Sequence, residues 1–421
     1  MFTRILFFAS ILLSVVIKAQ WYPQEVPDTS YKLRSVYFID DQTGWAAGNN
    51  GIIIKTTDGG RRWTKQTDSS RISLRSLFFV DKQNGWAVGS EYGTGYSVAL
   101  KTVNGGTNWK RLPIFSGPFQ SVFFIDSLTG WITGGPVDRG AKGIITKTTD
   151  GGATWKSQSA NAGHANFSVF FIDHQTGWLV GDEGIIFKTT NGGDIWVPQT
   201  SGVSDYLRTV RFINRQTGWI AGHNGIILKT TNGGETWINQ SVDNKIWLDS
   251  FNPVDSKTAW AAGIDYGTGS GTILKTVDGG LSWYPQIHPS NLQTERLSVF
   301  FLDGNKGWAV GDGTILKTTN GGDIFTSSNR NYTLLQNYPN PFNPVTTIKY
   351  AIPPGLQNEK VAVRLVIYNM LGEEVALLVN EEKPFGTWEA KWDASGVSSG
   401  VYFYRLTAGG YVDTRKMVLV R

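Results

Sequence analysis

Short apolar runs that end in an acidic residue recur along the first three quarters of the chain. Examples are Val36-Tyr37-Phe38-Ile39-Asp40 and Val169-Phe170-Phe171-Ile172-Asp173. A small residue and a Trp follow each run, mostly as Gly-Trp-x-x-Gly, and a third segment follows that, mostly as Gly-x-Ile-x-Lys-Thr. Short runs of this kind, bounded by glycine and turn residues, are typical of β-strands rather than helices. We therefore expect repeated units of short strands and an all-β fold.

A second string, T-x-[DN]-G-G-x-x-W, ends each unit, and its last position begins a fourth strand. The string starts at seven threonines spaced 41–46 residues apart, namely Thr56, Thr102, Thr148, Thr189, Thr230, Thr276 and Thr318. Four strands in a repeat of this length make one propeller blade. Repeated units could also form a solenoid, but seven units that can close on themselves favour a ring. The sequence predicts a seven-bladed β-propeller over residues 20–325.

An Asp or Asn stands at the third position of every copy of this string. These residues are Asp58, Asn104, Asp150, Asn191, Asn232, Asp278 and Asn320. Their short polar side chains can bond N–H groups of their own turn, and the paired glycines allow positive φ angles there. A calcium site needs 6–8 oxygens with several carboxylates, whereas four of these seven residues are neutral. We expect a structural role for them, with no metal and no cofactor.

The repeated string resembles the Asp-box of sialidases and of many other propellers. The order F-x-D, G-W-x-x-G and K-T-T-[DN]-G-G-x-x-W is more similar to the photosystem II assembly and stability factor family, over roughly residues 21–325. The resemblance implies a propeller that serves as an assembly or binding scaffold, although a shared fold does not transfer the photosystem role. It also implies an arginine patch for binding. The matching positions hold Arg34, Arg75 and Arg208, with Gln120, Phe167, Asp249 and Leu297 in the other units.

Two similar strings predict how the ring closes. Trp21-Tyr22-Pro23-Gln24 nearly repeats Trp283-Tyr284-Pro285-Gln286 of the sixth outer strand, yet no Asp-box precedes it. The seventh Asp-box ends at Phe325 instead of a Trp. We predict that residues 21–26 supply the outer strand of blade seven. Pairing the two ends of the ring would remove open strand edges.

Aromatic residues on loops suggest a binding face opposite the Asp-boxes. The loops Tyr92-Gly93-Thr94-Gly95 and Tyr266-Gly267-Thr268-Gly269 share one string, and Phe115 and Phe119 belong to the same expected face. Exposed loop aromatics suit protein or glycan binding, although they could instead fold onto neighbouring loops. The candidate binding face comprises Tyr92, Tyr206, Trp247, Tyr266, Arg34, Arg75 and Arg208.

A different pattern follows Phe325. Residues 326–336 read as a linker, and NYPNPFNP at 337–344 is followed by alternating apolar runs that predict a small immunoglobulin-like β-sandwich over 337–421. These motifs closely resemble the type A C-terminal sorting domain of the bacterial type IX secretion system. The resemblance implies export by Sec, passage through the outer membrane with the type IX machinery as partner, and surface attachment or release.

The first residues fit a signal peptide over residues 1–19. Arg4 precedes an uncharged stretch of 13 residues, and Lys18-Ala19-Gln20 offers a cleavage site after Ala19. That stretch is too short to cross a membrane as a helix. The chain has no cysteine, and its net charge of +5 is scattered, so no nucleic-acid footprint is expected. We expect a protein of the cell surface or extracellular space.

No known catalytic spacing occurs in the chain, including H-E-x-x-H, G-x-S-x-G and the P-loop. The four histidines fall in different units and are expected to be mostly solvated loop residues: His164, His174, His223 and His288. A sialidase would need an arginine cluster, a Tyr–Glu pair and an acid/base Asp. The sequence favours a binding or scaffold propeller. An Asp-box glycan-active enzyme is the alternative, because paired carboxylates can converge from distant blades.

Overall fold

The computed structural model places most of the chain in two compact units, one within Ala19–Asp323 and one within Ile324–Arg421. The residues that it describes are 21–67, 71–114, 117–135, 143–159, 164–286, 296–322, 332–337, 339–352, 360–383 and 386–420. The predicted signal peptide, Phe115, His288 and Phe325 lie outside the described residues. Within those ranges we find no helix with the length and apolarity needed to cross a bilayer.

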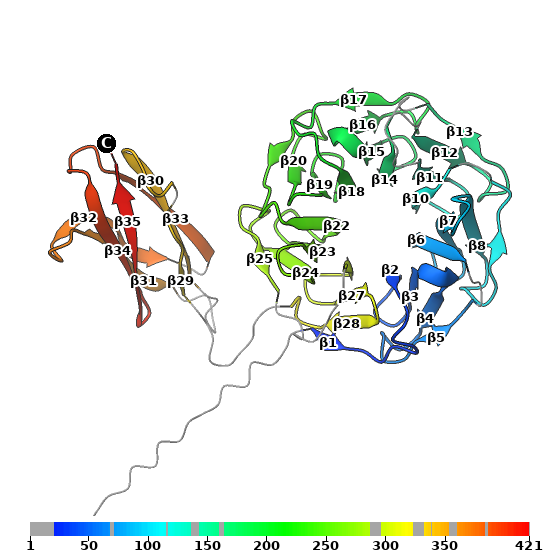
Figure 1. Cartoon of the computed structure of the whole chain (residues 1–421), viewed down its shortest axis with the longest axis horizontal. Coiled ribbons are helices and arrows are strands. Elements are labelled where there is room, and N and C mark those ends of the chain that lie inside the picture. The colour runs from blue at the N-terminus through cyan, green and yellow to red at the C-terminus, as the bar shows by residue number, and fades with distance from the viewer. Residues whose placement is uncertain are drawn as a thin grey trace, which may run out of the picture. The chain divides into compact units, whose positions relative to one another are not determined.

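The first unit is the predicted seven-bladed propeller, with seven antiparallel sheets of four strands arranged around a central channel (Figure 1). The innermost strands are β2 (Leu33–Phe38), β6 (Ile72–Phe79), β10 (Phe119–Phe124), β14 (Asn166–Phe171), β18 (Leu207–Phe212), β22 (Ile246–Pro253) and β26 (Ser298–Phe301). The second strands are β3 (Gly44–Gly48), β7 (Gly85–Glu91), β11 (Gly130–Gly134), β15 (Gly177–Gly181), β19 (Gly218–Gly222), β23 (Ala259–Asp265) and β27 (Gly307–Gly311). Two short 3-10 turns, η1 (Asn49–Gly51) and η2 (Asp182–Gly184), follow β3 and β15.

The two outer positions of each blade carry shorter strands. The third strands are β4 (Ile53–Thr56), β8 (Ser97–Thr102), β12 (Ile144–Thr148), β16 (Ile186–Thr189), β20 (Ile227–Thr230), β24 (Ser270–Thr276) and β28 (Thr314–Thr318). The outer strands are β5 (Thr64–Lys65), β9 (Lys110–Arg111), β13 (Lys156–Ser157), β17 (Val197–Gln199), β21 (Ile238–Asn239), β25 (Tyr284–Pro285) and β1 (Tyr22–Pro23). The four-strand reading of each repeat is therefore confirmed.

The ring closes through its N-terminal end, as predicted. Strand β1 pairs with β28 in blade seven, with Tyr22 opposite Lys317, and the indole of Trp21 is fully buried. Blade seven is joined to blade one by the indole N–H of Trp308, which donates to the carbonyl of Gly59 at 3.1 Å. The N-terminal segment thus completes the last sheet, and the ring has its two ends paired in one blade.

Adjacent blades are joined by stacking of a second-strand tryptophan on a phenylalanine of the next inner strand. Trp45 and Phe79 stack with centroids 3.6 Å apart at 9°, and the Trp45 indole N–H donates to the carbonyl of Gly105 at 3.0 Å. Six of the seven blade junctions share this arrangement. The exception is Trp219, because Pro253 occupies the phenylalanine position of blade six. Its indole N–H has no hydrogen-bond partner among the described residues.

The Asp-box residues bond within their own turns. The hydroxyl of Thr56 accepts the N–H of Gly60 at 2.9 Å, and Oδ1 of Asp58 accepts the N–H of Arg62 at 2.9 Å. In the fourth copy the neutral Asn191 accepts the N–H of Ile195 at the same distance. The turns therefore use an oxygen acceptor whether or not it carries a charge.

The second unit is a β-sandwich with sheets ordered β29-β30-β33 and β32-β31-β34-β35. Its strands are β29 (Thr333–Leu334), β30 (Val345–Ile352), β31 (Val361–Tyr368), β32 (Glu374–Lys383), β33 (Gly386–Asp393), β34 (Gly400–Ala408) and β35 (Tyr411–Leu419). The predicted linker over 326–336 is wrong at its end: Leu334 pairs with Tyr350 and is fully buried, because it fills the sandwich core. Residues 326–331 lie outside the described residues.

Candidate functional site

Six of the seven inner strands carry a β-bulge at the same position of the repeat, in the N-terminal half of the strand. The bulged residues are Arg34, Arg75, Gln120, Phe167, Arg208 and Asp249. A bulge bends its strand and re-aims a side chain. All six residues line one cavity of about 480 Å³, which Arg296 completes. We refer to this cavity, defined by these seven residues, as the mouth.

In blade seven, the residue that aligns with the bulged residues in sequence is not the one that supplies a polar group to the mouth. Leu297 matches the bulged residues in sequence, but its side chain is 1 % exposed and packs in the same apolar cluster as Trp260. Both residues border the mouth, and Arg296, one residue earlier, supplies the charged group there, because it contacts Asp249. An apolar side chain is more stable in the core than at a wet rim. Sequence matching therefore missed Arg296, although an arginine beside the S-V-F-F run was a usable signal.

The mouth carries more positive than negative charge. Arg208 contacts the carboxylate of Asp249 at 3.1 Å, and Arg296 contacts the same carboxylate at 3.5 Å. Arg34 contacts Asp312 at 3.5 Å. Arg75 makes no ion pair or hydrogen bond with any residue that the structure describes. Four guanidinium groups thus share the mouth with one carboxylate of its lining.

The surroundings of Arg75 disfavour its charge. Its side chain reaches solvent, but the walls of the mouth partly desolvate it, and this burial lowers its pKa. The positive charges of Arg208, Arg34 and Arg296 lower the pKa further. Arginine stays protonated at neutral pH even so. Like charges held together in a recess create a positive potential that attracts anions.

An arc of aromatic rings flanks the mouth. His223 stacks on Trp247 with centroids 4.1 Å apart, Trp247 meets Tyr266 at 4.2 Å, and Tyr206 lies 5.2 Å from His223. The guanidinium of Arg208 lies 4.4 Å above the ring of Phe167. Tyr206 and Tyr266 remain 42 % and 48 % exposed. One of these ring pairs is stacked and two are edge-to-face, which agrees with the alternative of aromatics folded onto neighbouring loops.

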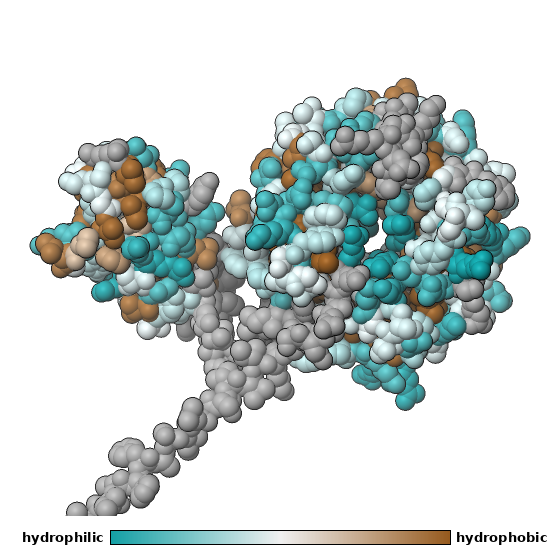
Figure 2. Space-filling model, in the orientation of Figure 1, coloured by the Kyte–Doolittle hydropathy of each residue, from teal (hydrophilic) through white to brown (hydrophobic). Residues whose placement is uncertain are grey.

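The structure gathers the candidate binding-face residues at one end of the channel. Arg34, Arg75, Arg208 and Tyr92 line the mouth, and Tyr206, Trp247 and Tyr266 form the arc beside it. The loops of Tyr92 and Tyr266 make equivalent contacts. The backbone N–H of Tyr92 donates to the carbonyl of Arg71, and that of Tyr266 donates to the carbonyl of Lys245; each acceptor lies just before the inner strand of the tyrosine's own blade. Figure 2 shows hydrophilic residues around the central opening of the propeller.

One sequence expectation near this face is wrong, and one histidine departs from what was expected for most of the four. Phe119 is fully buried between blades two and three instead of exposed, because it starts an inner strand at the position of Leu33 and Leu74. The side chain of His223 is only 13 % exposed, so it is not a solvated loop residue. Burial first, and then the positive charge of Arg208, lower the pKa of His223 to about 4. The ring is therefore neutral at physiological pH and suited to stacking.

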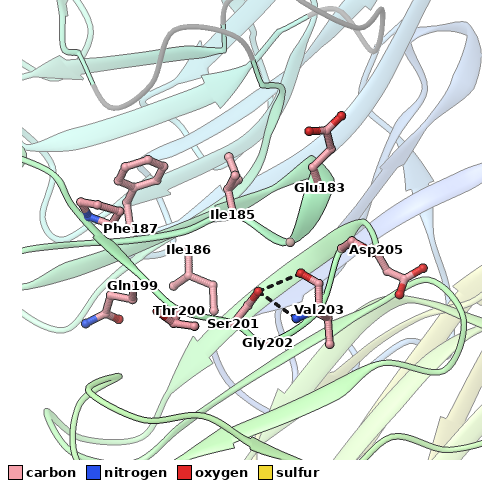
Figure 3. A pocket seen from close by; sticks show the side chains of 13 residues that line it. Glu183, Ile185, Ile186, Phe187, Gln199, Thr200, Ser201, Gly202, Val203 and Asp205 are labelled. Carbon is pink, nitrogen blue, oxygen red and sulfur yellow. Dashed lines mark hydrogen bonds between the residues drawn. The ribbon is translucent and has the colours of Figure 1, made fainter.

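A larger open groove of about 690 Å³ runs along blade four (Figure 3). Its two carboxylates, Glu183 and Asp205, point in different directions, and Asp205 accepts a hydrogen bond from Asn224 at 2.5 Å. The hydroxyl of Ser201 bonds the main chain of Val203. Because no polar side chains converge there, the mouth is the better candidate site. Across the described residues, no three His, Cys, Asp or Glu side chains are grouped so that they could hold a metal ion.

Comparisons with solved structures agree with this architecture. YCF48 bound to D1 peptide is 21 % identical over 72 % of this chain and 96 % of that one, with a TM-score of 0.57. YCF48 from Cyanidioschyzon merolae is 21 % identical over 73 % of this chain and 100 % of that one, with a TM-score of 0.56. The GH74 enzyme of Niastella koreensis is 13 % identical over 94 % of this chain and 74 % of that one, with a TM-score of 0.56. At these identities the likeness shows the fold alone.

The sequence profiles of two families match the chain. The profile described as secretion system C-terminal sorting domain matches residues 336–420. The profile described as photosynthesis system II assembly factor YCF48 matches residues 13–118, 119–197 and 164–252. No curated protein sequence matches. The second profile spans residues 13–252, more than half of the 421 residues, so the chain belongs to the photosynthesis system II assembly factor YCF48 family and carries a C-terminal sorting domain of a secretion system.

Proposed function

We propose that the chain is an exported binding or scaffold propeller that acts at the cell surface or in the extracellular space. The match of residues 336–420 to a secretion-system sorting domain supports export across the outer membrane. In this proposal the sandwich engages the type IX machinery, and the propeller is its cargo. The two compact units fit this division, because the propeller completes its own last sheet with β1.

The mouth is the proposed ligand site, and its ligand is an acidic segment of a partner protein. The observation that carries this proposal is Arg75, which lies in the mouth beside three further arginines and has no ion pair among the described residues. Guanidinium groups bind carboxylates through paired hydrogen bonds. His223 stacks on Trp247 and Tyr266 also contacts it, so less of the Trp247 face is open to stacking of a sugar ring, which favours a protein segment.

A glycan-active enzyme is the second candidate, because Asp249 stands among arginines in the mouth. Glycosidases generally need two carboxyl groups on opposite sides of the scissile bond. Asp249 is the only carboxylate among the described residues that line the mouth, and it is paired with Arg208 and Arg296. We expect no turnover of fluorogenic sialosides or aryl glycosides. Turnover that disappears in Asp249→Asn would establish the enzyme instead.

The proposed binding is tested by titrating the full chain with an acidic peptide and with its Gln-for-Glu analogue. The variant Arg75→Gln removes a charge without breaking an ion pair to the described residues. Arg62→Gln removes an equal charge from an exposed side chain next to an Asp-box. We expect Arg75→Gln to weaken binding about tenfold, or about 1.4 kcal/mol, with Arg62→Gln unchanged. Equal affinity for both peptides, or equal losses in both variants, would refute the mouth as the site.

A further inference from the structure

A second cavity of about 350 Å³, here called the shaft, lies next to the mouth along the inner strands. One residue of each inner strand lines it, and each of these residues pairs with the tryptophan in the second strand of its blade. They are Tyr37, Phe78, Phe123, Phe170, Arg211, Asn252 and Phe300. Successive aromatic rings lie 5.0–5.1 Å apart. The shaft is therefore an aromatic girdle interrupted by one cation and one amide.

Arg211 is the one charged residue of the girdle. It stands three residues beyond the mouth residue Arg208 on β18, which corresponds to about 10 Å along the strand. Its only hydrogen bond to the described residues is from Nη1 to the carbonyl of Val210 at 2.9 Å. No Asp or Glu is among the described residues that line the shaft. Most of its N–H donors thus have no acceptor on the protein residues described.

Asn252, the equivalent residue in the next blade, is a polar residue of the girdle with a structural role. Asn252 accepts the N–H of Phe301 at 3.1 Å and donates to the carbonyl of Phe301 at 3.4 Å, which ties blade six to blade seven. Arg211 makes no such bond to the next blade. Burial lowers the pKa of Arg211 to about 10, partly offset by the phenol of Tyr37, so the group stays charged at neutral pH. A charge kept in an apolar shaft without a partner costs stability.

We propose that the shaft is a deep subsite in which Arg211 binds a carboxylate carried next to an aromatic or apolar group. The guanidinium supplies a planar fork of donors for the carboxylate, and the aromatic rings of the girdle enclose the apolar part. This subsite deepens the proposed function, because a protein segment would enter it through the mouth. The carboxylate belongs either to a chain end or to an acidic side chain, since both present the same group.

The test uses the full chain and three small probes. They are N-acetyl-phenylalanine, with a terminal carboxylate, N-acetyl-phenylalaninamide, with none, and the N-acetyl-Phe-Glu amide, with a side-chain carboxylate. Binding is followed by calorimetry and by the shift of the thermal unfolding midpoint. We expect at least one carboxylate probe to bind and the amide to bind at least tenfold more weakly. The better carboxylate probe identifies the source of the group.

The variant Arg211→Met separates a ligand-binding arginine from a structural one. We expect it to lose the preference for the carboxylate probes while its unfolding midpoint, without probe, stays equal or rises, because an unpaired cation has been removed. Arg211→Lys should keep part of the preference, and Arg62→Gln, which changes an exposed side chain beside an Asp-box, should keep all of it. A lower midpoint in Arg211→Met with unchanged probe binding would overturn the subsite. Loss in Arg75→Gln but not in Arg211→Met would place carboxylate binding in the mouth alone.

Discussion

The indole of Trp21 meets the ring of Phe301 edge-on, with centroids 5.6 Å apart and an interplanar angle of 89°. The outer tryptophan of blade one makes the same contact, since Trp63 lies 5.8 Å from Phe38 at 89°. Equivalent pairs occur in blades two to five, whereas in blade six Trp283 meets Phe251, because Pro253 holds the phenylalanine position. Trp21 therefore fills the outer position of blade seven with the geometry of a regular repeat.

Removing the indole of Trp21 should destabilise the whole propeller. Trp21 is fully buried, whereas the neighbouring Tyr22 is 46 % exposed. We expect Trp21→Ala to lower the free energy of unfolding by about 3–5 kcal/mol, the usual cost of emptying a buried aromatic site. Tyr22→Ala should cost far less. Chemical denaturation of both variants beside the unaltered chain measures the difference, and matching midpoints would show that the N-terminal segment does not hold the ring.

Acid should remove a contribution that Asp40 makes to stability. Burial acts to raise the pKa of Asp40, but Lys82 and the N–H groups of Thr43 and Gln42 outweigh it and hold the pKa at about 2. A carboxyl whose pKa is depressed in the folded state stabilises above its unfolded pKa, near 4, and loses this effect as the pH falls toward 2.

The natural Asn214 makes the equivalent turn bonds, so Asp40→Asn is a matched change. We expect the variant to be less stable near neutral pH, by at most about 1 kcal/mol because the pair with Lys82 is partly exposed. The difference in free energy of unfolding between the two proteins should vanish as the pH falls to about 2. Unfolding curves across this range check it, and a difference that does not depend on pH would contradict the assigned cause.

The Asp-boxes should depend on an oxygen acceptor and not on charge. Oδ1 of Asn191 accepts the N–H of Ile195 and the hydroxyl of Thr189, each at 2.9 Å. Asn191→Asp should therefore be nearly neutral, and Asn191→Ala should cost about 1 kcal/mol. Thermal unfolding with and without added calcium provides the measurement. Stabilisation of Asn191→Asp by calcium would mean that these turns are metal sites.

Sorting should fail without the sandwich. Deleting residues 331–421 should leave a folded propeller in the periplasm, because β1 closes the ring without any contribution from the second unit. Cell fractionation locates the truncated protein, and protease resistance of the propeller serves as the folding control. Normal amounts of truncated protein at the surface or in the medium would show that residues 331–421 are not the sorting signal.

The repeat made the blades, their order and the closure by residues 21–26 predictable, because each depends on a pattern along the chain. The mouth was predictable only in part. Arg296-Leu297-Ser298 differs from Leu33-Arg34-Ser35 by an exchange of two residues, and burial of the leucine decides which one faces the channel. Residues such as His223 and Arg211 could not be assigned, because their surroundings come from neighbouring blades and not from their own repeat.

The most direct test of the mouth as the binding site is photo-crosslinking of the full chain in its own cells. A crosslinking residue at Gln120 lies in the mouth, and one at Thr107 lies exposed beside an Asp-box. We predict a crosslink from position 120 to an acidic segment of a protein, much reduced in the Arg75→Gln background, and none to that segment from position 107. A crosslink that persists unchanged in Arg75→Gln, or one formed only from position 107, would contradict the proposal.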